Sequence, residues 1–158
     1  MAAPNPNSSQ DEAKLVAALQ RWADGKATLR EVRGYTDEEL YAIAKTAYFF
    51  FYQGRVNEAR TLFQGLYAVN PTDAYFAKAL GVVELAAGNA QGALAAYDVA
   101  IKLAPNDVQA HVGRAEVKLA LGQKPQAIED LRKATGMAPE DDPVARKAAA
   151  MISALSRK

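Results

Sequence analysis

The residues of this 158-residue chain that could take part in chemistry are few and poorly placed for it. There is one histidine, His111, and no cysteine, so a histidine-based metal site, a catalytic triad and thiol chemistry have no support. Asp37, Glu38 and Glu39 form a carboxylate cluster, but they fall in the expected first turn of a helix, where the helix dipole favours negative charge. No glycine-rich run precedes a Lys-Ser or Lys-Thr pair, so no phosphate-binding loop is present. We therefore expect no enzyme, no metal site and no cofactor, and we expect His111 to pack in the core.

The remaining charges point to an ordinary soluble surface. Asp130, with Arg132 and Lys133, has the pattern of a solvated helix face. The formal net charge is +1, and without a basic run there is no strong field for nucleic acid or an anionic membrane. No apolar run reaches the roughly 18 residues of a membrane span, and the first residues do not read as a secretion signal. We expect a soluble cytoplasmic protein with no nucleic-acid partner and no membrane insertion.

Four tyrosines have side chains suited to binding another polypeptide: Tyr41, Tyr48, Tyr52 and Tyr75. A tyrosine combines an apolar ring with a hydroxyl that tolerates water, which suits a surface that is wet when empty and dry when filled. Whether these rings share one surface depends on the elements that carry them.

Those elements repeat with a fixed spacing. Four residue types recur 34 residues apart between Leu40 and Asp141: Gly54, Gly88 and Gly122; Ala59, Ala93 and Ala127; Pro71, Pro105 and Pro139; Asp73, Asp107 and Asp141. This period and punctuation are typical of tetratricopeptide repeats, in which each repeat is a pair of antiparallel helices. The proline ends one helix, the aspartate caps the next, the glycine turns the chain with positive φ, and the alanine lies where the two helices cross closely. We expect an all-α fold, with three helical hairpins in a right-handed solenoid, an N-terminal helical arm and a C-terminal capping helix.

The domain boundaries follow from this punctuation. Residues 1–8 are expected to form a disordered tail, 9–36 the arm and 37–158 the repeat domain. The repeats cover about 40–73, 74–107 and 108–141, followed by a capping helix over 142–156. The expected helices are at about 37–53 and 56–69, 73–87 and 90–103, and 107–121 and 124–136. In the arm, Ser9 with Glu12 opens a helix, a helical turn spans Thr28–Arg33, and Thr36 with Glu39 forms a capping box.

The offset of a residue within its repeat predicts the side it faces. Core positions are expected at Leu40, Ile43, Phe49, Phe50, Phe63, Leu66, Leu80, Gly81, Tyr97, Ala100, Ala115, Leu131 and Ala134. The first helix of each repeat lines the concave side of such a stack. The expected groove residues are Tyr41, Ala44, Lys45, Tyr48, Phe51, Tyr52, Tyr75, Lys78, Val82, Leu85, Gln109, Val112, Glu116 and Leu119. An alternative is that the N-terminal helix folds over Tyr41 and Tyr48.

A group of residues in the N-terminal half indicates a narrower family than the repeat pattern alone does. It consists of Ala27-Thr28-Leu29-Arg30-Glu31-Val32, Thr36, Leu40-Tyr41, Tyr48, Gly54, Ala59, Phe63-Gln64, Leu66, Asp73, Phe76 and Leu80-Gly81. Over about residues 27–100, the chain resembles the class II chaperones of bacterial type III secretion, the SycD/LcrH type. The Thr-Leu-x-x-Val lead-in before Leu40-Tyr41 is the distinctive part.

The resemblance implies a cytoplasmic bacterial chaperone that binds hydrophobic translocator proteins and keeps them soluble before export. In that family an extended translocator segment lies in the concave groove, and by position the groove aromatics here are Tyr41, Tyr48, Tyr52 and Tyr75. Members often form homodimers through the N-terminal arm, which corresponds to residues 9–33. The arm residues expected to make that contact are Leu15, Leu19, Trp22 and Leu29.

Two features differ from the family pattern and keep a second hypothesis open. A proline ends every repeat, as in general tetratricopeptide repeats, and the third repeat adds no aromatic ring to the groove. The alternative is a general adaptor, or a scaffold of a bacterial secretion or pilus assembly. A clamp for a peptide C-terminus needs lysine and asparagine at set offsets, which here hold Ala44, Tyr48, Ala79, Gln109 and Gly113, so that version is disfavoured.

Overall fold

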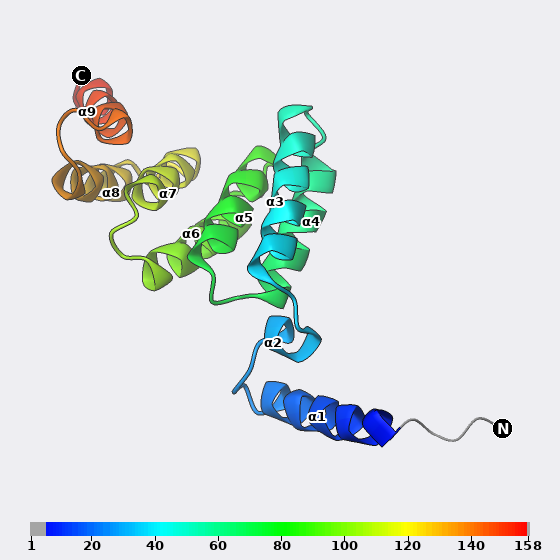
Figure 1. Ribbon diagram of the computed structural model, residues 1–158. Helices are drawn as coiled ribbons and strands as arrows, with labels where there is room; N and C mark the ends of the chain where they lie inside the picture. Colours follow the sequence, from blue (N-terminus) through cyan, green and yellow to red (C-terminus); the bar gives the residue numbers. More distant parts are fainter. Residues whose placement is uncertain (1–5, 158) are drawn as a thin grey trace.

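The chain is built from antiparallel helical hairpins that lie side by side (Figure 1). The computed structural model describes the backbone of residues 6–157 and the side chains of residues 10, 11 and 13–157. The hairpins are α3 (Asp37–Tyr52) with α4 (Val56–Val69), α5 (Ala74–Ala86) with α6 (Ala90–Leu103), and α7 (Val108–Ala120) with α8 (Lys124–Met137). The last helix, α9 (Pro143–Ser156), packs on α8 and closes one end of the stack. The all-α repeat fold is therefore confirmed, and no described helix is long and apolar enough to cross a membrane.

Local chemistry sets the helix ends. The hairpins turn at Gly54, Gly88 and Gly122, whose φ values of 77°, 81° and 74° favour glycine. Asp73 and Asp107 accept hydrogen bonds from the first-turn amides of α5 and α7, at 2.9 and 3.0 Å. Because these signals lie in the local sequence, the predicted hairpin helices begin and end within one residue of the observed ones.

The close crossings and the core also follow the repeat. Ala59, Ala93 and Ala127 are each 0% exposed, as expected where two helices meet. Phe63 and Phe76 fill the core of the first hairpin and its contact with α5, and Leu131 fills that of the third. His111 is buried as predicted, with its Nε2 atom 2.8 Å from the carbonyl oxygen of Pro105.

The arm consists of α1 (Pro6–Ala23) and the short α2 (Leu29–Arg33). The Thr36–Glu39 capping box before α3 is confirmed, and a second box joins Thr28 to Glu31 before α2. Helix α1 begins at Pro6, so the predicted start at Ser9 is wrong, and residues 6–8 of the predicted tail are helical. Residues 1–5 of that tail, and the predicted Ser9–Glu12 box, lie outside the described residues or side chains.

Two residues predicted in the core are on the surface. Ile43 is 40% exposed and Phe49 is 58% exposed. The repeat offsets assume a neighbouring hairpin on both sides, but within the described part of the chain no hairpin precedes α3, so this face of the helix lacks the neighbour that would cover it. The prediction was wrong because the first unit of a stack has an open edge.

A charged cluster in the third repeat was also mispredicted. Asp130 is 1% exposed rather than solvated. Its carboxylate accepts two hydrogen bonds from the guanidinium of Arg114, at 2.7 and 2.8 Å, and lies 2.7 Å from Nζ of Lys118. Burial works against the charged form, but Arg114 and Lys118 hold the pKa of Asp130 below its ordinary value. Arg114 also pairs with Asp98 of α6 at 2.8 Å, so the cluster connects the second and third hairpins.

Candidate functional site

The four predicted tyrosines form one continuous group, which we call the tyrosine cluster: Tyr41, Tyr48 and Tyr52 of α3 and Tyr75 of α5. The ring centroids of Tyr41 and Tyr75 are 5.2 Å apart, and those of Tyr48 and Tyr75 are 6.3 Å apart. Tyr52 continues the row, stacked on Tyr48 with a centroid distance of 6.2 Å. The repeat structure therefore brings together rings that are up to 34 residues apart in the sequence.

The rings differ in how far they are buried. Tyr52 is 82% exposed and Tyr41 is 36% exposed, whereas Tyr48 and Tyr75 are half-buried. Tyr48 meets the buried ring of Phe63 edge-on, with 4.9 Å between centroids. The inner rings thus belong partly to the core and partly to the surface, and the outer rings are free to make further contacts.

The hydroxyls of Tyr41, Tyr48 and Tyr75 remain protonated at neutral pH. The Tyr41 hydroxyl donates a hydrogen bond to Oδ2 of Asp73 at 3.0 Å. Burial and this carboxylate raise the pKa of Tyr41 to about 12. Burial also raises the pKa of Tyr48 and of Tyr75 above the ordinary tyrosine value. These three phenols are therefore neutral, and the proton of Tyr41 is already donated to Asp73.

The other predicted groove residues become more polar toward the third repeat. Nζ of Lys78 lies 2.6 Å from Oδ2 of Asp107 and 3.3 Å from Oε1 of Gln109. Glu116 pairs with Lys147 of α9. The remaining predicted residues on this side are exposed or half-buried: Lys45, Phe51, Val82, Leu85 and Leu119. The tyrosine cluster thus lies on α3 and α5, whereas the charged pairs join α5 to α7 and α7 to α9.

Two residues predicted to line the groove do not reach its surface. Ala44 is 1% exposed and lies in the first core cluster, because its side chain is too short to pass the rings that pack there. Val112 is 3% exposed and packs in a cluster with Ala148 of α9. Both predictions were wrong, the second because the capping helix covers a position that an open repeat would expose.

Sequence comparison adds a family to this geometry. Models of the tetratricopeptide repeat match residues 45–108 and 84–152. The chain is a tetratricopeptide-repeat protein. A comparison of its sequence with proteins of curated function finds no match.

Solved structures share its fold. The type III secretion translocator chaperone SycD of Yersinia enterocolitica has a TM-score of 0.75 at 21% identity, covering 81% of this chain and 98% of SycD. PcrH in complex with the chaperone binding region of PopD has a TM-score of 0.72 at 23% identity, covering 78% and 95%. A type III secretion complex from Aeromonas hydrophila has a TM-score of 0.79 at 21% identity, covering 88% and 95%. The tetratricopeptide-repeat protein thus has the fold of the translocator chaperones over most of its length.

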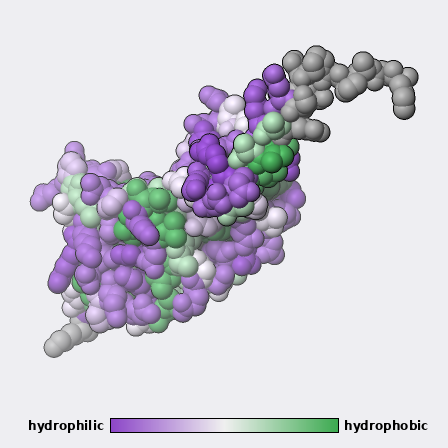
Figure 2. All heavy atoms as spheres, turned by 90° about the horizontal axis from the view of Figure 1, so that it is seen from below, coloured by the Kyte–Doolittle hydropathy of each residue, from purple (hydrophilic) through white to green (hydrophobic). Residues whose placement is uncertain are grey.

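The arm of the tetratricopeptide-repeat protein carries an uncovered apolar stripe. Leu15, Leu19 and Trp22 of α1 are 46%, 42% and 46% exposed, and Leu29 of α2 is half-buried. Figure 2 shows apolar surface on the arm, next to the grey N-terminal end. Helix α1 packs against α2 and extends away from the hairpins (Figure 1), so the alternative in which it folds over Tyr41 and Tyr48 has no support.

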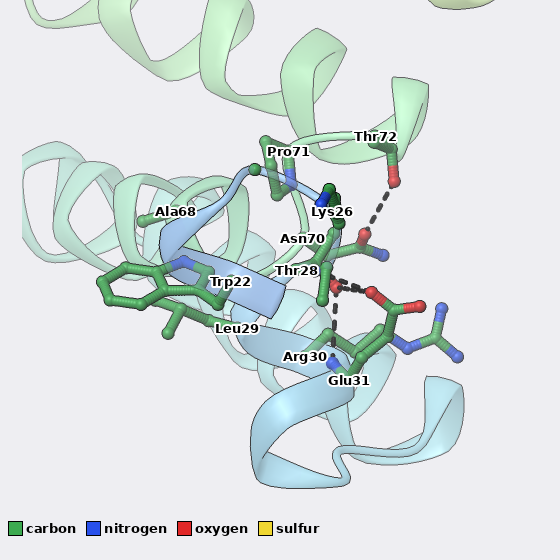
Figure 3. Close-up of a pocket in the computed structure, with 12 residues that line it drawn as sticks. Trp22, Lys26, Thr28, Leu29, Arg30, Glu31, Ala68, Asn70, Pro71 and Thr72 are labelled. Atoms are coloured by element: carbon green, nitrogen blue, oxygen red, sulfur yellow. Dashed lines mark hydrogen bonds between the residues drawn. The ribbon is translucent and has the colours of Figure 1, made fainter. Parts of the chain in front are cut away.

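A cavity lies at the elbow between arm and repeats rather than in the groove. It has a volume of about 590 Å³ and is bounded by the arm on one side and the α4–α5 turn on the other. Figure 3 shows Trp22 beside Leu29 and Ala68 in its wall, with the Thr28–Glu31 capping box nearby. The arm is therefore loosely packed where it joins the first repeat, a feature that the repeat pattern did not predict.

Proposed function

We propose that this protein is a cytoplasmic chaperone of a bacterial type III secretion system. It binds an extended segment of a hydrophobic translocator protein in its concave groove and keeps that protein soluble before export. The single observation that carries the proposal is the tyrosine cluster, a row of partly exposed rings on the first helices of a translocator-chaperone fold.

Complexes of similar proteins support the choice of ligand. PcrH has been solved with the chaperone binding regions of PopD and PopB, and SycD with a peptide of the translocator YopD. Each is 21–23% identical to this chain. Their common feature is a short segment of a translocator bound to the same helical fold, and the tyrosine cluster offers this chain a surface for such a segment.

Binding needs no bond making or breaking, so we assign no enzymatic activity. Each apolar anchor of the client that leaves water contributes about 25 cal/mol per Å² of covered surface, before the cost of ordering the segment. An extended segment has few internal contacts to lose. The Tyr48 hydroxyl can pair with its backbone, and the Tyr41 oxygen, whose proton is donated to Asp73, can accept from a backbone N–H. Many weak contacts along a groove also allow release without chemical change.

A second copy of the chain is the other partner that we propose. The stripe of Leu15, Leu19 and Trp22 is large, apolar and uncovered in the single chain, which favours an interface. SycD has been crystallised as a dimer, including an alternative one. We propose a homodimer formed through the arm, over residues 9–33, with Leu29 at its base.

The test is capture of the client from the native cell, with identification of the bound protein by mass spectrometry. A membrane-pore translocator retained by the wild type and lost with Tyr52→Ala supports the proposal. Capture of a ring or pilus component instead would establish the scaffold hypothesis. A translocator retained equally by wild type and variant would remove the tyrosine cluster from the mechanism.

A further inference from the structure

Tyr97 of α6 is held in a slot between two glycines of neighbouring helices. The residue is 4% exposed, and its ring packs in the second core cluster. A Cβ atom added to Gly81 of α5 would lie 2.7 Å from Cε2 of the ring, closer than real Cβ contacts. A Cβ atom added to Gly113 of α7 would overlap the hydroxyl oxygen. Only glycine at both positions lets the ring pass between α5 and α7, so the side chain of an outer helix crosses the layer of inner helices.

The hydroxyl end of that ring reaches the layer of first helices that is expected to line the concave side. The hydroxyl lies beside Gly113, and the carboxylates of Glu116 and Asp107 are near enough to act on its ionisation. Burial, Glu116 and Asp107 together raise the pKa of Tyr97 to about 12, so the phenol stays protonated. On the other side, Tyr48 of the tyrosine cluster is close enough for its own pKa to respond to Tyr97. The hydroxyl therefore lies between the aromatic end of the groove and α7.

The Tyr97 hydroxyl has no hydrogen bond to any described residue. In this it differs from the Tyr41 hydroxyl, which donates a hydrogen bond to Asp73. In the empty groove water can satisfy the Tyr97 hydroxyl. A ligand that covers the groove removes that water, and a buried hydroxyl without a partner is unfavourable. An extended polypeptide offers one carbonyl acceptor per residue along its length.

We propose that the Tyr97 hydroxyl, delivered through the Gly81–Gly113 slot, is a fixed hydrogen-bond donor in the groove floor that binds a backbone carbonyl of the extended client segment. It sets the register of the segment, because one carbonyl must stand over the gap between α5 and α7, between the apolar anchors held by the tyrosine cluster and the charged pairs of Lys78 and Glu116. This inference rests on the proposed function, since it assigns a role within the same groove. Tyr97 lies on α6, the second helix of its hairpin. The repeat offsets place only residues of the first helices in the groove, so this contact goes beyond them.

The test uses Tyr97→Phe, which keeps the ring in its slot and removes the donor alone. The probes are synthetic peptides of the chaperone binding regions of PopD and PopB and the YopD peptide, measured by titration calorimetry. Loss of one neutral hydrogen bond predicts an affinity about 5-fold weaker than that of the wild type. The matched control is Tyr67→Phe, because Tyr67 lines a separate cleft between α4 and α6 and its hydroxyl should not affect the affinity.

A scan of the peptide with single amide-to-ester replacements locates the acceptor, since an ester carbonyl accepts hydrogen bonds more weakly. At one position the replacement should weaken binding to the wild type and leave binding to Tyr97→Phe unchanged. Equal affinity of Tyr97→Phe and wild type, with the circular-dichroism melts matching, would overturn the Tyr97 inference and leave the chaperone proposal intact. Failure of the wild type to bind any of the three peptides, together with failure to capture a translocator from cells, would overturn both.

Discussion

Tyr52 is the residue at which binding can be separated from folding. Its side chain is 82% exposed, so it contributes little to the core, yet it stacks on Tyr48 at the end of the tyrosine cluster. A buried tyrosine covers about 200 Å², and about 160 Å² of such a side chain remains free here. A client that covers half of that free area removes about 80 Å² from water, which is worth about 2 kcal/mol, or about 30-fold in Kd.

Tyr52→Ala should therefore weaken client binding by up to about 30-fold and leave the thermal melt within about 1 °C of the wild type. Titration calorimetry with the captured translocator segment gives the first quantity, and circular dichroism gives the second. The matched control is Phe49→Ala, which removes another exposed ring from the same helix, 58% exposed and outside the cluster. It should bind the client as the wild type does.

Three results would refute this reasoning. An unchanged Kd for Tyr52→Ala would mean that the client does not touch the cluster. A melt lowered by several degrees would mean that the ring stabilises the first hairpin despite its exposure, in which case the loss of binding would have a structural cause. Equal loss in Tyr52→Ala and Phe49→Ala would point to a general hydrophobic surface rather than a groove.

Three further changes test the fold and the interface. Asp130→Ala removes the buried carboxylate that pairs with the partly buried Arg114 and Lys118, leaving Arg114 only Asp98, and should lower the free energy of unfolding by up to about 3 kcal/mol in a denaturant titration. Because the pKa of Asp130 is held below its ordinary value of 3.8, the advantage of the wild type over this variant should be complete at neutral pH and shrink only as the pH falls below 3.8. Ala93→Leu places a larger side chain at a crossing that is 0% exposed and should lower the melting temperature by about 2–10 °C. Leu19→Asp should convert a dimer to a monomer in light scattering, with helical content unchanged, and Gln20→Asp should not.

Each of these has an outcome that contradicts it. A melt of Asp130→Ala equal to that of the wild type would mean that the cluster is solvated in solution. A fully stable Ala93→Leu would show that the helices do not cross at that alanine. A dimer that persists in Leu19→Asp would place the interface outside the arm.

The parts of the structure that the sequence predicted well are those decided by nearby residues. The turn at Gly88, the cap at Asp107 and the capping box of Thr36 with Glu39 each depend on a few consecutive positions, so their spacing locates the helix ends. The tyrosine cluster was predictable because the same offsets recur in successive repeats. The register of a repeat thus carries information about neighbours that are far apart in the chain.

The errors occurred where the two ends of the stack break the repeat. Val112 is covered by α9, and Phe49 is exposed because no hairpin precedes α3, so the same offset rule failed in opposite directions at the two ends. Asp130 was misplaced because its partners Arg114 and Lys118 occupy positions where a repeat usually has apolar side chains, and only the packed structure shows that the three charges meet. The role of the Tyr97 hydroxyl was missed for a related reason. The position of its ring depends on two glycines from different helices, Gly81 and Gly113, whose proximity only the packed structure shows.

The bridge from Asp98 through Arg114 to Asp130 has a consequence for the modular character of the solenoid. Ideal repeat proteins can be lengthened, shortened or shuffled because every joint is alike. Here the joint between the second and third hairpins pairs an acid of α6 with a base of α7, so a copy of the third hairpin inserted elsewhere would keep the internal Arg114–Asp130 pair and lose the one to Asp98. The joints of this solenoid are thus not all alike, and a hairpin moved to a new position would have to find a new acid beside Arg114 to restore the second ion pair.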